Sequence, residues 1–68
     1  MKSASKLTPR EIEILNLVAP GKRQKAIAYE LDISPHTVKN TLANISHKLS
    51  LSGAINIVNY ARSVGVIA

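Results

Sequence analysis

One stretch constrains the fold more than any other part of the chain, because residues 34–49 carry a complete amphipathic-helix pattern. Ser34 suits the N-cap of a helix, and Pro35 follows at the first helical position, where its missing N–H costs nothing. Apolar residues then recur four, three and four positions apart, which places them on one buried stripe: Val38, Leu42, Ile45 and Leu49. The other side has no acid and carries His36, Lys39, Asn40, Ala43, Asn44 and His47. On this stretch alone an ordinary amphipathic surface helix explains the pattern, and a helix that enters the major groove of DNA is the competing interpretation.

Composition and charge limit the function classes. A chain of 68 residues without cysteine forms one small domain and excludes disulfides and thiolate metal sites. The formal net charge is +5, and all acids precede Ile33: Glu11, Glu13, Glu30 and Asp32. The second half therefore favours a polyanionic partner through counterion release, although a basic domain without such a partner would have the same charge. No apolar run approaches the roughly 20 residues of a membrane span. We expect a cytoplasmic protein with no membrane partner.

A capping box predicts a first helix that starts at Pro9. Thr8 suits its N-cap and Glu11 falls at the third helical position, the spacing at which the two residues cap each other reciprocally. The helix should end near Ala19, because Pro20-Gly21 follows. Its inner positions are expected to be Ile12, Leu15, Val18 and Ala19, with Ile14 and Leu17 beside them. Residues 1–6 are expected to form a flexible arm before a domain that spans residues 7–68.

Two further helices complete an all-α prediction. A short helix from about Gln24 to Leu31 precedes the 34–49 helix by three residues, and a link that short predicts a helix-turn-helix. A last helix from about Gly53 to Ser63 is expected to be capped by Ser52. Its predicted inner positions are Ala54, Ile57, Val58, Ala61 and Val64. The fold class is thus a four-helix bundle that contains a helix-turn-helix.

Catalysis and metal binding find no support in the residue pattern. His36 and His47 are eleven residues apart, about three helical turns, which is too far for one metal ion. No Gly-x-Ser-x-Gly elbow is present, and the chain is too short to wrap a substrate pocket. We therefore expect no enzyme, no cofactor and no small-molecule ligand. The cations Lys22, Arg23 and Lys25 at the start of the second helix form either a solvated turn or a phosphate clamp beside the DNA groove.

Several blocks resemble the LuxR-type (GerE-like) helix-turn-helix domain. They are Leu7-Thr8-Pro9-Arg10-Glu11-Ile12-Glu13-Ile14-Leu15, residues 25–40 and Asn44-Ile45-Ser46-His47-Lys48-Leu49, all in register. The resemblance runs from about Leu7 to Ile67. It implies a four-helix DNA-binding domain, commonly the C-terminal output module of a transcriptional regulator, whose third helix reads the major groove of double-stranded DNA.

The resemblance also implies roles for individual residues. Groove-facing positions would be Lys39, Asn40 and Ala43, and phosphate contacts would be Lys25, Thr37 and Lys48. The charge cluster at the start of the second helix adds Lys22 and Arg23 as expected phosphate contacts. The family commonly dimerises through the fourth helix, which implies a homodimer through Ala54, Ile57, Val58 and Ala61. RNA polymerase is a further partner that membership would imply.

The chain departs from the family pattern at several positions. Arg23 replaces a frequent serine that would cap the second helix, Ala26 replaces a usual glutamate, and Thr41 replaces a frequent histidine. The basic residues that usually follow the third helix are here Ser52-Gly53-Ala54. The weakened cap at Arg23, the missing basic residues after the third helix and the methyl group of Ala43 support a second hypothesis, a protein-interaction module that keeps the fold without specific DNA binding.

Overall fold

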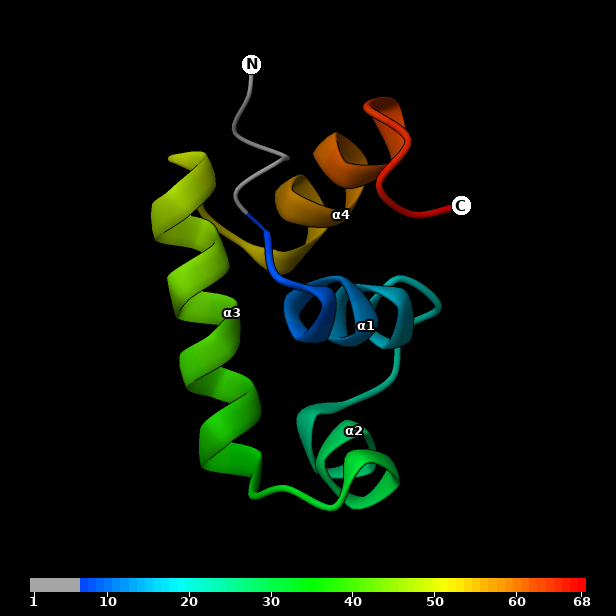
Figure 1. Ribbon diagram of the computed structural model, residues 1–68, viewed down its shortest axis with the longest axis vertical. Coiled ribbons are helices and arrows are strands. Elements are labelled where there is room, and N and C mark those ends of the chain that lie inside the picture. Colours follow the sequence, from blue (N-terminus) through cyan, green and yellow to red (C-terminus); the bar gives the residue numbers. More distant parts are fainter. Residues whose placement is uncertain (1–6) are drawn as a thin grey trace.

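Four helices account for the fold of residues 7–68, the part of the chain that the computed structural model describes (Figure 1). They are α1 (Pro9–Val18), α2 (Gln24–Leu31), α3 (Pro35–Leu49) and α4 (Ala54–Ser63), and this described range contains no strand. The all-α prediction is confirmed, and the helix bounds agree with the expected ones to within one residue. The arm expected at residues 1–6 lies outside the described residues.

The helix starts show which predicted caps form. In α1 the Thr8 hydroxyl accepts the Glu11 N–H at 3.1 Å, and the Glu11 carboxylate accepts the Thr8 N–H at 2.8 Å, so the predicted capping box is present. Ser34 caps α3 by accepting the Thr37 N–H at 3.1 Å. The prediction that Ser52 caps α4 is wrong. Gly53 is the N-cap, at a φ of +87° that places the Ser52 side chain outside the capping position, and the Ser52 carbonyl instead accepts the side-chain amide of Asn56.

A residue with a left-handed backbone conformation ends each of α2 and α3 and sets the direction of the chain that follows. Asp32 and Ser50 have φ values of 58° and 56°. After Asp32, the Ile33 N–H returns to the Ala28 carbonyl at 2.9 Å, which closes the last turn of α2 and aims the chain into α3. In Figure 1, α2 is seen nearly end-on while α3 runs along the long axis, so the two helices cross steeply as expected of a helix-turn-helix.

The apolar core consists of two clusters that α1 and α3 share. The first joins α1, α3, α4 and the C-terminal tail and contains Leu7, Leu15, Ile45, Leu49, Ile57, Val58, Ala61 and Ile67. The second joins α1, α2 and α3 and contains Ile14, Ile27, Ala28 and Val38. Val18 and Leu42 pack against both clusters. The predicted inner stripe of α3 is confirmed, because three of its residues are buried and Leu42 lies between the two clusters.

Two predicted core positions of the last helix are wrong, because their side chains are exposed. On α1, the predicted inner residue Ile12 is only partly buried. Ala54 is exposed at the first turn of α4, and Val64 lies beyond the helix with 46% of its surface exposed. On α1 it is Ile14, not Ile12, that is fully buried together with Leu15. The reason is that α1 packs on two sides, against α2 through Ile14 and against α3 and α4 through Leu15.

Candidate nucleic-acid interface

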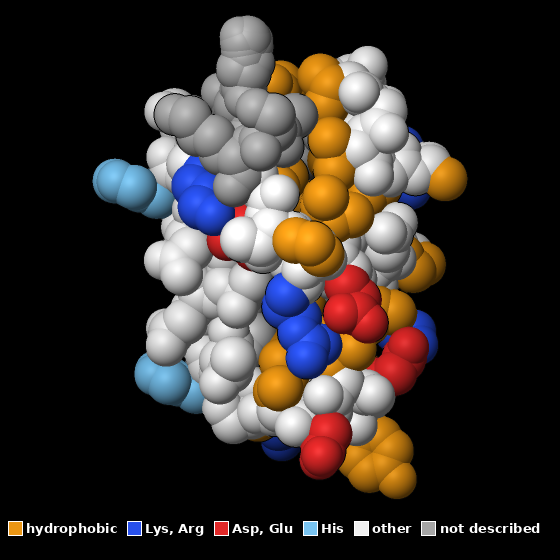
Figure 2. All heavy atoms as spheres, viewed as in Figure 1, with side chains coloured by type: hydrophobic (Ala, Val, Ile, Leu, Met, Phe, Trp, Pro, Cys, Tyr) orange, Lys and Arg blue, Asp and Glu red, His pale blue; other side chains and the backbone are white. Residues whose placement is uncertain are grey.

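The outer face of α3 lies opposite its buried stripe. Lys39, Asn40 and Ala43 are all exposed, whereas Val38 and Ile45 on the inner side have no exposed surface. The one-turn spacing of residues 39, 40 and 43 puts their side chains on neighbouring positions of one helix face. Figure 2 shows this side of the molecule at the left, where the two histidines of the chain, both on α3, project into solvent.

Acidic side chains do not compensate the charge of this face. α3 and α4 contain none, and Glu13 and Glu30 are engaged elsewhere. Glu13 pairs with Arg10 at 3.3 Å within α1, and Glu30 in the last turn of α2 pairs at 2.5 Å with Lys22 in the turn before that helix. The outer face of α3 thus combines positive charge with neutral hydrogen-bonding groups, which suits an anionic partner.

The basic cluster before α2 is brought together as predicted. Lys22, Arg23 and Lys25 are all exposed around the first turn of α2. Arg23 is the N-cap residue and makes no side-chain cap bond, as expected from its inability to accept a hydrogen bond. The partial positive charge of the helix N-terminus therefore lies beside three cations, an arrangement that favours a phosphate.

Thr37 is exposed in the first turn of α3. Its hydroxyl lies 2.9 Å from that of Ser34, and its N–H is the one that Ser34 caps. The hydroxyl group is therefore fixed at the start of α3, where it can still accept or donate one more hydrogen bond.

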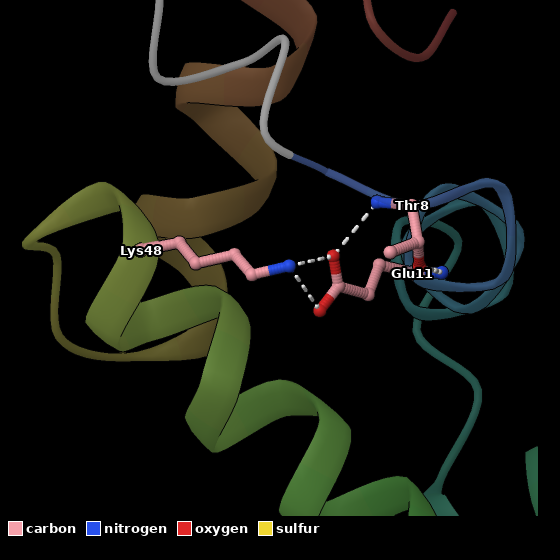
Figure 3. Close-up of polar contacts among 3 residues, drawn as sticks. All are labelled: Thr8, Glu11 and Lys48. Carbon is pink, nitrogen blue, oxygen red and sulfur yellow. Dashed lines mark hydrogen bonds and ion pairs between the residues drawn. The ribbon is translucent and has the colours of Figure 1, made fainter.

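Lys48 is placed differently from the other predicted phosphate-binding residues. Its ammonium lies 2.8 Å from one Glu11 carboxylate oxygen and 3.0 Å from the other, and Glu11 is itself only 6% exposed (Figure 3). Burial by itself would raise the pKa of Glu11, but the hydrogen bonds from Lys48 and from the Thr8 N–H, with the attraction of the Lys48 charge, lower that pKa below its ordinary value of 4.5. From the sequence, Glu11 is expected to act at the start of α1, and its pair with Lys48 is not predicted.

The outer side of α4 borders a shallow hollow against the turn between α1 and α2. The hollow has a volume of about 370 Å³ and is lined by Val18, Ala19, Gly21, Lys22, Ala54, Ile55, Val58, Asn59 and Arg62. Ile55, which lines this hollow, is 77% exposed. By contrast, Ile57, Val58 and Ala61 are buried in the first cluster of their own molecule. The expectation that these three residues form a dimer surface is therefore wrong, and of the four only Ala54 is exposed.

Residues 7–68 give no support for a metal site or for a membrane-spanning helix. Within that range, no three histidine, cysteine, aspartate or glutamate side chains gather as metal ligands would. None of the four helices has the length and apolarity needed to cross a membrane.

Comparisons with known proteins agree with this geometry. Residues 5–61 match the GerE family, described as bacterial regulatory proteins of the luxR family. The chain is 42% identical over 62 residues to the transcriptional regulatory protein DesR of Bacillus subtilis (strain 168), which covers 91% of this chain and 31% of DesR. It is 47% identical over 55 residues to the transcriptional regulatory protein LiaR of the same organism, covering 81% and 26% of the two chains.

A third relative, the transcriptional regulatory protein FixJ of Rhizobium meliloti (strain 1021), is 39% identical over 59 residues, 87% of this chain and 29% of FixJ. The chain thus spans less than a third of the length of these relatives. The four helices, with the turn between α2 and α3, lie within nearly the same residues that the family match covers. The chain belongs to the LuxR family of bacterial regulatory proteins, as a DNA-binding helix-turn-helix domain of transcriptional regulators.

Proposed function

We propose that this domain reads a specific sequence in double-stranded DNA by inserting α3 into the major groove, and so directs a transcriptional regulator to its site. The observation that carries the proposal is the exposed, acid-free face of α3, held outward by a largely buried apolar stripe on the other side. The bacterial chromosome lies in the cytoplasm, and the domain would act there.

Each groove-facing residue has a chemical role in this proposal. Asn40 can pair with the N6 and N7 atoms of adenine through two hydrogen bonds, and Lys39 can donate to the O6 and N7 acceptors of guanine. Ala43 offers a methyl group, which suits contact with the methyl group of thymine and donates no hydrogen bond. Sequence reading would thus rest mainly on Lys39 and Asn40.

Phosphate contacts would position α3 without reading sequence. Lys22, Arg23 and Lys25 would meet one strand at the start of α2, and Thr37 would meet a phosphate at the start of α3. The exposed pair between Lys22 and Glu30 leaves that cation accessible, because exposed ion pairs are weak and exchange with other partners readily.

Two alanine variants test the proposal, once a bound sequence has been selected from a random duplex pool. Lys39→Ala should weaken binding to that site by about 1–3 kcal/mol and flatten the preference at one base position. Lys25→Ala should weaken binding to all sequences alike and reduce the slope of log affinity against log salt by about one. Fluorescence anisotropy over a salt series measures both, with Arg10→Ala on the outer side of α1 as the matched control. If the wild-type domain fails to bind random duplex at low salt, DNA binding is refuted and the protein-interaction module is favoured.

We further propose that the domain dimerises through the outer side of α4, using Ala54, Ile55, Asn59 and Arg62. The support is the exposure of Ile55 beside an apolar hollow, since a large apolar side chain in water favours an apolar contact. Two half-sites about 34–36 Å apart, or a multiple of that distance, would then be bound together.

Ile55→Glu should abolish paired binding to two half-sites while leaving the affinity for one half-site within about twofold, because a carboxylate in an apolar contact is strongly disfavoured. Analytical ultracentrifugation on duplexes with one and two half-sites measures this. Asn56→Glu places the same charge on the next residue, which does not line the hollow, and should leave pairing intact. Equal loss in both variants would refute the α4 contact.

A further inference from the structure

A single buried carboxylate joins the start of α1 to the end of α3. Among residues 7–68, Glu11 is the only charged side chain in the buried class. Its carboxylate accepts three hydrogen bonds, one from the Thr8 N–H at 2.8 Å and two from the Lys48 ammonium at 2.8 and 3.0 Å. Both oxygens are thus occupied, and no buried side-chain polar atom in the described range lacks a partner. The three residues converge as Figure 3 shows, with the Lys48 side chain reaching from α3 toward the cap of α1.

The pair lies where apolar packing alone would leave the orientation of α3 loosely defined. Leu7 and Leu49, the neighbours of Thr8 and Lys48 in the sequence, are both in the first cluster. Apolar contacts of this kind are not directional. A charge-assisted contact to both oxygens of one carboxylate is short, and it adds a fixed distance between the last turn of α3 and the capped start of α1.

The same contact removes Lys48 from the cations that are available to DNA. Its charge is neutralised by a carboxylate that cannot turn to another partner, because that carboxylate is buried and also holds the α1 cap. A phosphate contact by Lys48 would leave the Glu11 carboxylate buried without its cation, which is strongly unfavourable. The exposed cations before α2 carry no such penalty.

We propose that Glu11 and Lys48 are positioning residues for DNA reading: their pair fixes the last turn of α3 on the capped start of α1, and Lys48 serves this contact in place of a phosphate. This inference rests on the proposed function, because it concerns how the α3 face is aimed at the groove. It changes the role that the family resemblance implies for Lys48.

Four variants distinguish the effect of the Glu11–Lys48 pair on DNA binding from the effect of the α1 cap and from the effect of overall stability. Glu11→Gln removes the charge but keeps an oxygen that accepts the Thr8 N–H, so the cap of α1 remains. Lys48→Met keeps the length and apolar stem of the side chain without the ammonium. The double variant Glu11→Gln/Lys48→Met leaves no unpaired charge, and it keeps the test valid if Lys48→Met alone fails to fold. Lys48→Arg restores a cation that can bond both carboxylate oxygens.

The measurement is the affinity for the selected site and for random duplex over a salt series, at a temperature where circular dichroism shows each variant folded. We expect Glu11→Gln, Lys48→Met and the double variant each to lower the ratio of specific to random affinity by about tenfold, and by the same factor because the two residues act as one unit. The salt slope on random duplex should stay at the wild-type value in Lys48→Met and in the double variant, and Lys48→Arg should keep the specificity ratio of the wild type. The matched control is Glu13→Gln, which makes the same change in the exposed pair with Arg10 and should leave the ratio unchanged.

Three outcomes would overturn the inference. A salt slope reduced by about 0.9 in Lys48→Met, with equal loss on both duplexes, would make Lys48 a phosphate contact. An unchanged specificity ratio in folded Glu11→Gln would reduce the pair to a contribution to stability. If the wild-type domain binds neither duplex, the proposed function itself fails, and that result is distinguishable because it appears before any variant is made.

Discussion

Ile45→Ala is expected to lower the free energy of unfolding by about 3 kcal/mol, the typical effect of removing a buried isoleucine side chain. Ile45 has no exposed surface and lies in the middle of the first cluster, between α1 and α4. A domain of this length has a total stability of only about 3–10 kcal/mol, so the change removes a large part of it. Urea denaturation followed by circular dichroism, at two protein concentrations, measures the effect.

The matched control for Ile45→Ala is the same substitution at Ile55. That side chain is 77% exposed on α4, so Ile55→Ala removes little buried area and should change stability by less than about 0.5 kcal/mol. If the two variants lose equal stability, α4 does not pack as described. A loss at Ile45 that is confined to low protein concentration would instead indicate a core completed by a second copy.

Lys48→Met is expected to lower the free energy of unfolding by about 2 kcal/mol at neutral pH, because it leaves a buried carboxylate without a cation that is itself 31% exposed. Glu11 has a pKa lowered below 4.5 in the folded protein, so its pairing contributes stability above its unfolded pKa. That contribution is lost as the pH falls through the folded pKa, where the carboxyl group becomes neutral. The difference between wild type and Lys48→Met should therefore be largest above about pH 4.5 and should shrink at lower pH.

Urea denaturation of both proteins from pH 7 down to pH 3 measures this difference. Arg10→Met is the control, because it breaks the exposed pair with Glu13, whose two side chains are 51% and 54% exposed. Arg10→Met should lower the free energy of unfolding by less than about 0.5 kcal/mol at neutral pH. A difference for Lys48→Met that stays constant over this pH range would show that lost packing of the lysine stem, and not the ion pair, is responsible.

Local sequence signals predicted most of the fold. The capping box at Thr8 and the Ser34-Pro35 start of α3 act within one helical turn, and both appear as the spacing indicates. The α3 stripe is also a local pattern, and the outward placement of Lys39 and Asn40 follows from it.

Features set by tertiary packing or by backbone conformation were not predictable in the same way. Glu11 and Lys48 are 37 positions apart, and no periodicity links them, so their pair is not predicted. At α4 the serine was preferred as a cap because of its hydroxyl, but the left-handed Gly53 sets the helix start one residue later. That start leaves Ala54 exposed.

The division of the core into two clusters has a consequence for how the domain opens in solution. α2 contributes Ile27 and Ala28 to the second cluster, which has four buried residues against eight in the first, and Arg23 gives it no side-chain cap. Elements with few buried contacts exchange their amide hydrogens through partial unfolding, below the free energy of global unfolding. Native-state hydrogen exchange should therefore show α2 opening while α1, α3 and α4 stay closed. Occupation of the basic cluster by a phosphate would slow this exchange, so the protection of α2 would report binding directly.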